Sequence, residues 1–122
     1  MFSFIDVVAL SKTHVWTINV GISMSAALVM LLSGQKRFTL PHAMALIHSG
    51  SGGASGTFEQ SKEAMANYEK QVRKMREYIM THTSIDKKTM TKNQAKDWYL
   101  DADEQVKYGI VDKICDDVDE FN

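Results

Sequence analysis

The apolar positions of this chain fall into short blocks that are separated by glycine and serine. Residues 15–20 are rich in β-branched and aromatic side chains and end at Gly21, which predicts a strand. Residues 25–33 form a compact apolar block, which predicts a helix ending at Gly34. A strand that turns at once into a buried helix, with a serine at the turn, is one way in which folds expose a hydroxyl beside free backbone N–H groups.

Apolar blocks of strand length flank this turn. Residues 2–11 are strongly apolar, and a run this short is compatible with either a buried helix or a strand. Residues 36–40 predict a short strand at a sheet edge, which ends at Pro41. Residues 43–47 are continuously apolar, as in a fully buried strand, and this strand ends at His48.

A glycine-rich tract, residues 49–56, leads into the longest predicted helix, residues 57–82. Thr57 and Gln60 form a capping-box pattern at its start. Apolar residues then recur at spacings of three and four and form one stripe: Met65, Tyr68, Val72, Met75, Tyr78 and Ile79. A stripe of this length is expected to pack against the body of the protein or against a neighbouring subunit.

The C-terminal third predicts a helix from Ser84 or Asp86 to Asn93 and a short strand or extended turn at 98–100. A second helix is predicted to be capped by Asp101 and to end at Gly109. A strand at 110–114 and a frayed acidic tail at 116–122 follow. Strands that alternate with helices favour an α/β layer arrangement with crossover connections. No repeat or linker divides the sequence, so residues 1–122 are interpreted as one domain.

Composition narrows the possible functions. The 122 residues are 44% hydrophobic and 24% charged, which is ordinary for one globular domain. The net charge of −1 argues against a nucleic-acid binder that depends on phosphate contacts. A single cysteine, Cys115, excludes an internal disulfide and a cysteine-based zinc cluster, and it favours a cytoplasmic location. Residues 13–35 carry no Asp, Glu, Lys or Arg, but the wholly apolar part is shorter than the roughly 20 residues that span a bilayer.

The residue types near the turn suggest acyl-transfer chemistry, which needs a hydroxyl, a base, an orienting carboxylate and donors for the oxyanion. Ser25 supplies the hydroxyl at the first turn of the apolar helix, where the N–H of Ala26 would face the oxyanion. His48 ends a buried strand, a setting that the other three histidines lack. Ser25 as a helix cap and His48 as a core histidine are the structural alternatives.

Residues 4–114 resemble the ClpP family, the proteolytic subunit of the Clp serine proteases. Residues 17–27 are similar to its nucleophile motif, with Gly21 four residues before Ser25. Residues 36–41 and 46–48 are similar to its histidine motif. Glycines in the following tract, the helix at 57–82 and the segment 97–102 continue the match, and this last segment places Asp97 at the position of the family's acidic residue.

The resemblance implies a ClpP/crotonase-like spiral of β-β-α units, truncated at the N-terminus, with residues 57–82 as a protruding handle helix. It implies a serine endopeptidase that cleaves unfolded proteins through Ser25, His48 and Asp97 without a metal or cofactor. Ala26, Ser51, Gly52 and Gly53 would hold the oxyanion and the substrate backbone. Subunits of this family stack into rings and are fed by a Clp-type ATPase, so the expected partners are copies of the chain and that ATPase.

Three alternatives remain open at this point. An alignment from Gly21 forwards selects Ser25 as nucleophile, whereas a gapless alignment backwards from Arg37 selects Ser23. Ser25 is preferred, because its alignment puts the deletion in the loop at Gly34 and Gln35, and loops accept deletions more easily than a catalytic turn. Ser49 and Gly50 stand where the family has Gln-Pro, and the family's N-terminal strands and second oxyanion donor precede the region matched here. The chain is therefore also compatible with an inactive subunit that has a structural role, or with a crotonase-like acyl-CoA enzyme.

Overall fold

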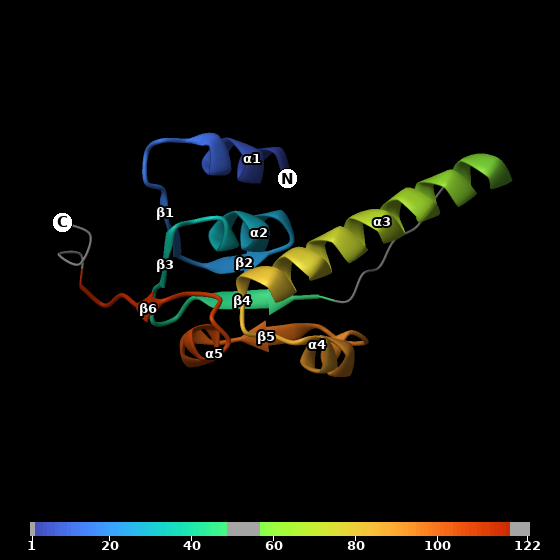
Figure 1. Cartoon of the computed structure of the whole chain (residues 1–122). Coiled ribbons are helices and arrows are strands. Elements are labelled where there is room, and N and C mark those ends of the chain that lie inside the picture. The colour runs from blue at the N-terminus through green and yellow to red at the C-terminus, as the bar shows by residue number, and fades with distance from the viewer. Residues whose placement is uncertain (1, 49–56, 118–122) are drawn as a thin grey trace.

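The computed structural model describes residues 2–48 and 57–117 (Figure 1). The elements in chain order are α1 (Phe2–Leu10), β1 (Trp16–Asn19), β2 (Ile22–Met24), α2 (Ala26–Leu32), β3 (Lys36–Thr39), β4 (Met44–Ile47), α3 (Phe58–His82), α4 (Lys87–Asn93), β5 (Trp98–Leu100), α5 (Ala102–Lys107) and β6 (Lys113–Ile114). The mixed α/β arrangement that the sequence predicts is thereby confirmed, and the apolar segment at 2–11 is a helix.

In the described chain the strands form two three-stranded sheets, in the orders β1-β3-β6 and β2-β4-β5. β1 and β3 run parallel, as do β2 and β4, whereas β4 and β5 are antiparallel. The chain thus places one strand in each sheet, passes through α2 and then adds the next strand to each sheet. Parallel neighbours need such a crossover, and α2 supplies it.

The core lies where α2, β4, β5 and the C-terminal part of α3 meet. Its buried members are apolar: Leu28, Leu31, Leu32, Ala45, Ile79, Ile85, Met90, Trp98, Leu100, Ile110 and Val111. The compact apolar block of α2 and the apolar run of β4 therefore both contribute side chains to this core, and both lead directly to the candidate site.

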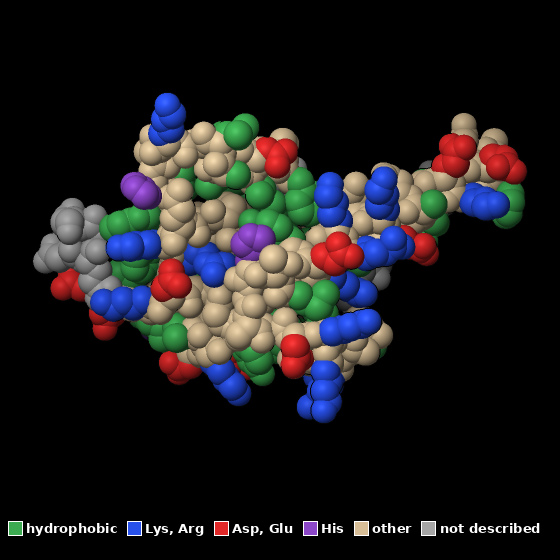
Figure 2. Space-filling model, viewed as in Figure 1, with side chains coloured by type: hydrophobic (Ala, Val, Ile, Leu, Met, Phe, Trp, Pro, Cys, Tyr) green, Lys and Arg blue, Asp and Glu red, His purple; other side chains and the backbone are tan. Residues whose placement is uncertain are grey.

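The stripe on α3 contacts the body only over the C-terminal part of the helix. The helix begins with the capping box of Thr57 and Gln60, as the sequence predicts, and its N-terminal half projects from the body (Figure 1). Met65 on this projecting half is 37% exposed, whereas Ile79 is buried. Lys, Arg, Asp and Glu side chains are spaced along the projecting part (Figure 2).

The structure differs from the sequence-based predictions at three strands. β3 is not an edge strand, because it pairs with β1 on one side and with β6 on the other. The final strand covers only Lys113–Ile114, because Ile110 and Val111 pack into the core beyond the end of α5. The short strand β2, which directly precedes Ser25, was not expected, and it pairs with β4.

Gly34 follows α2, as expected, but for a different reason. Of the glycines that the structure describes, only Gly109 has a positive φ, of 73°. A Cβ at Gly34 would collide with the Thr17 side chain and lie 3.0 Å from the carbonyl oxygen of Lys36. This glycine therefore permits the close approach of the α2–β3 connection to β1.

β1 and β2 each form an outer edge of their sheet within the described chain. Apolar side chains at or beside these strands are exposed: Trp16, Ile18, Val20, Ile22 and Met24. Unpaired edges with apolar side chains are surfaces that a further strand can cover. Among the described helices, none is both long enough and apolar enough to cross a membrane.

Candidate active site

Ser25 occupies the junction between β2 and α2 in a strained backbone conformation. Its φ of 50° and ψ of −120° make it the one non-glycine residue with a positive φ among residues 2–48 and 57–117. Such a conformation costs about 1–3 kcal/mol and persists only where the surrounding structure holds it. In the described structure its side chain makes no cap hydrogen bond to α2, so the capping alternative for this serine is wrong.

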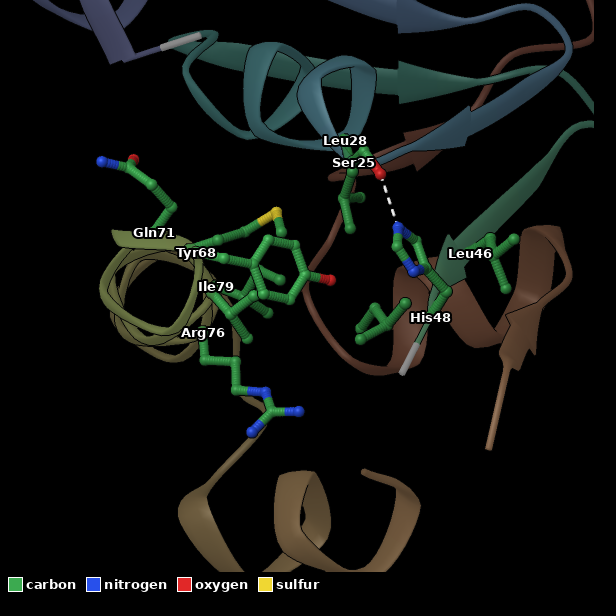
Figure 3. Close-up of a pocket in the computed structure, with 11 residues that line it drawn as sticks. Ser25, Leu28, Leu46, His48, Tyr68, Gln71, Arg76 and Ile79 are labelled. Atoms are coloured by element: carbon green, nitrogen blue, oxygen red, sulfur yellow. Dashed lines mark hydrogen bonds between the residues drawn. The ribbon is translucent and has the colours of Figure 1, made fainter. Parts of the chain in front are cut away.

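The strained turn directs the Ser25 hydroxyl to a histidine. Ser25 Oγ lies 2.6 Å from Nε2 of His48, the residue that follows β4, as the dashed line in Figure 3 shows. Both side chains are half-buried. With the ring proton on Nδ1, the hydroxyl donates to Nε2, which is the geometry in which a histidine takes a proton from serine.

Ser23 has a different role. Its hydroxyl donates to Oδ1 of Asn19 at 2.8 Å, and the side chain is only 8% exposed. In a strand, residues 23 and 25 would share a face, but β2 ends at Met24 and the chain turns sharply at Ser25. Of the two serines that the sequence leaves open, Ser25 is therefore the one whose hydroxyl meets a histidine.

Asp97 comes directly before β5, next to the end of its pairing with β4. β4 and β5 are antiparallel, and their register ends with Ile47 opposite Trp98. His48 and Asp97 come next after this last pair, so a continued register would place them opposite each other. Directly opposed antiparallel residues share a face of the sheet. Asp97 is exposed, and in the described part of the chain no hydrogen bond or ion pair of its carboxylate is found.

Ala26, the predicted oxyanion donor, is the first residue of α2 and is exposed. The N–H groups of a helix's first turn have no acceptor within the helix, so this group is available to a substrate oxygen. Ser51, Gly52 and Gly53, the predicted substrate-binding residues, lie outside the described residues.

A largely apolar pocket of about 210 Å³ opens beside Ser25 and His48. Leu28 from α2 and Tyr68 and Ile79 from α3 point into it (Figure 3). The remaining residues of its wall are Leu46, Ile47, Gln71, Val72, Met75 and Arg76. The arrangement leaves space for an apolar side chain next to the Ser25 hydroxyl.

Sequence reasoning missed this pocket, because the stripe on α3 was interpreted as a packing surface alone. Apolar periodicity does not distinguish a residue that fills a core from one that lines a cavity. The sequence also carried no signal for the positive φ of Ser25, since serine rarely adopts that conformation.

A family model described as Clp protease matches residues 1–118 of the chain. The chain belongs to the Clp protease family.

ATP-dependent Clp protease proteolytic subunit 2 of Treponema denticola is 33% identical over 116 residues, which cover 93% of this chain and 58% of that protein. The corresponding subunit of Streptococcus mutans is 33% identical over 118 residues, which cover 93% of this chain and 60% of that protein. For the subunit of Deinococcus radiodurans the identity is 32% over 117 residues, which cover 91% of this chain and 55% of the relative. The chain thus spans less than two thirds of the length of these relatives.

Proposed function

We propose that this chain belongs to a serine endopeptidase subunit of the ClpP type, with Ser25, His48 and Asp97 as its catalytic triad. The observation that carries the proposal is the 2.6 Å contact between Ser25 Oγ and His48 Nε2, made by a serine that its backbone holds in a strained turn. Membership of the Clp protease family supports it.

In the proposed reaction, His48 Nε2 takes the proton of Ser25 as Oγ attacks the peptide carbonyl. The Ala26 N–H donates to the oxyanion that forms. His48 then gives the proton to the leaving amine, and water hydrolyses the acyl-enzyme by the reverse sequence. Asp97 would hold the imidazole in the tautomer that leaves Nε2 unprotonated, a role that its place next to the last pair of the β4–β5 register supports.

The apolar pocket beside Ser25 would receive the side chain that precedes the cleaved bond. Its wall combines α2, β4 and α3, so an apolar side chain gains by leaving water there. We further propose that Ser51, Gly52 and Gly53 bind the substrate backbone as an added strand. Extended backbone binding suits unfolded polypeptides, because a folded substrate does not present a free strand.

The order of elements supports a spiral of β-β-α units, since β1 and β2 precede α2 along the chain and β3 and β4 follow it, with one strand of each two in each sheet. In this proposal residues 1–122 form one partial protease domain, with residues 57–82 as the handle helix through which rings of subunits stack. A Clp-type ATPase would deliver substrate in the cytoplasm, and the chemistry requires no metal or cofactor.

A second function, a catalytically inactive subunit with a role in assembly, is favoured by one observation. Within the described residues the exposed Asp97 carboxylate makes no hydrogen bond, so nothing there shows it orienting the histidine. A crotonase-like acyl-CoA enzyme has no use for a serine–histidine contact, and no observation favours it.

Covalent labelling distinguishes the first two functions. An active-site serine reacts with a fluorophosphonate probe, so we expect mass spectrometry to find the adduct on Ser25 and to find none in Ser25→Ala. Ser23→Ala distinguishes the two serines and should still carry the adduct on Ser25, because the Ser23 hydroxyl is hydrogen-bonded to Asn19 and not to a histidine. Absence of any adduct in the folded wild-type chain would support the inactive subunit, and an adduct on Ser23 would overturn the assignment.

A further inference from the structure

A buried cluster of uncharged polar side chains lies behind the site. Asn19, Ser23 and Gln105 are 1%, 8% and 0% exposed, respectively, and they come from the end of β1, from β2 and from α5. We call these three residues the Asn19 network. Buried polar groups are costly unless they are hydrogen-bonded, so the partners of this network carry information about its role.

Within the network the three side chains bond to one another. Ser23 Oγ donates to Asn19 Oδ1 at 2.8 Å, and Asn19 Nδ2 donates to Gln105 Oε1 at 3.1 Å. The backbone N–H of Gly21 also donates to Asn19 Oδ1, at 3.3 Å. The network therefore encloses the corner through which the chain passes from β1 to β2.

The two side-chain amides also donate outward, to the backbone of two other segments. Asn19 Nδ2 donates to the carbonyl of Met44 at 2.9 Å. Gln105 Nε2 donates to the carbonyls of Ala43 and Leu100, at 2.9 and 3.2 Å. Each NH₂ group thus uses both of its hydrogens, and a fully satisfied network of this kind specifies one arrangement of its surroundings.

The three segments joined in this way lead to the three proposed catalytic residues. Ser23 lies two residues before Ser25, and Met44 begins the strand that ends next to His48. Leu100 ends the strand that follows Asp97. We propose that Asn19, Ser23 and Gln105 are positioning residues, which hold β2, β4 and β5 in the relative placement that brings Ser25 onto His48. The inference rests on the proposed function.

Two features of the fold explain why β2 and Ser25 need additional hydrogen bonds to stay in place. β2 carries the serine but has only three residues, and in the described chain it pairs with β4 alone. Ser25 itself is strained, and strain persists only where neighbouring structure over-determines it. A displacement of about 1 Å at a reacting group can cost about 100-fold in rate. The Asn19 network thus adds side-chain hydrogen bonds to β2, whose backbone is paired along one edge only.

The test uses two substitutions in the network and one matched control. Ser23→Ala removes a single hydroxyl, and Gln105→Leu removes the amide that reaches β4 and β5. Thr17→Val is the control, because Thr17 lies on β1 and donates one hydrogen bond, at 2.7 Å, to the carbonyl of Leu31 in α2 rather than to β4 or β5. All proteins are compared at temperatures at which they are fully folded.

Two readouts are measured on each protein: the rate of fluorophosphonate labelling at Ser25 and the imidazole resonances of ¹⁵N-labelled histidines. We expect Ser23→Ala to slow labelling about tenfold, and Gln105→Leu up to about 100-fold. The double variant should be little slower than Gln105→Leu, because the network acts as a unit. The His48 resonances should change in both variants, whereas those of His14 and His82, which bond elsewhere, should not.

Unchanged His48 resonances in Ser23→Ala and Gln105→Leu would overturn the inference, as would an equal slowing of labelling by Thr17→Val. If Gln105→Leu does not fold, Ser23→Ala decides the outcome alone. A wild-type chain that is not labelled at Ser25 refutes the proposed function. In that case the His48 resonances still show whether the network controls the Ser25–His48 contact.

Discussion

At the scale of single residues, the site depends on one unusual backbone conformation. Ser25 adopts a positive φ, and its hydroxyl consequently leaves the helix that it precedes and meets His48. The neighbouring Ser23 donates its hydroxyl hydrogen to Asn19, and this hydroxyl is therefore not directed to His48. Two serines that lie two positions apart in the sequence thus have different environments.

Asp97 provides the prediction at this scale. If its carboxylate orients His48, Asp97→Asn should slow fluorophosphonate labelling of Ser25 by several orders of magnitude, up to about 10⁴-fold, because the imidazole would favour the wrong tautomer. Asp103→Asn is the control, since Asp103 is also an exposed aspartate and lies in the first turn of α5, the helix that follows β5. Equal labelling rates for wild type, Asp97→Asn and Asp103→Asn would show that Asp97 has no part in the reaction.

At the scale of elements, the helix starts follow directly from local sequence. Thr57 with Gln60 and Asp101 with Glu104 form capping boxes, and Asp86 caps α4 through the N–H of Thr89. The end of α3 depends on tertiary contacts instead. Arg37 on β3 donates to the carbonyls of His82 and Leu32, and burial lowers its pKa while the nearby Asp112 opposes that change.

The cap of α4 predicts a pH dependence. The hydrogen bonds from Thr89 lower the pKa of Asp86 below its usual value. A lowered folded-state pKa stabilises the fold above the unfolded value of about 4, and this stability is lost as the pH falls through the folded value. Asp86→Asn keeps the cap but does not titrate. Urea unfolding followed by circular dichroism should therefore show a smaller loss of stability on acidification for the variant than for wild type. Parallel curves for the two proteins would contradict this origin of the acid sensitivity.

At the scale of the whole molecule, two surfaces remain uncovered in the described chain. The edges at β1 and β2 carry exposed apolar side chains. The N-terminal half of α3 projects from the body (Figure 1), and Met65 of its apolar stripe is exposed. Unburied apolar area of this kind marks association surfaces.

The projecting helix predicts self-association. If α3 mediates stacking, Met65→Lys should place a charge in the contact and reduce the oligomer mass measured by light scattering, whereas Asn67→Lys, on the opposite face of the helix, should not. Both residues are exposed, so neither change should affect folding or the labelling of Ser25. A wild-type protein that remains at 13.7 kDa at all concentrations, or equal dissociation by both variants, would refute this role.

The sequence by itself determined the elements whose cause is local. The capping residues at Thr57, Asp86 and Asp101, the apolar block of α2 and the apolar run of β4 each predicted an element that the structure contains. The sequence also predicted Ser25 and His48 as candidate partners, because one follows a turn into a buried helix and the other ends a buried strand.

Only the tertiary structure decided how these elements meet. β3 is central because β6, far along the chain, pairs with it, and Gly34 is required because Thr17 packs against it. The contact of Ser25 with His48, the pocket on α3 and the Asn19 network all depend on contacts between segments that are distant in sequence. Such contacts are set by packing and by the satisfaction of buried hydrogen bonds, which a local pattern of apolar and polar residues does not encode.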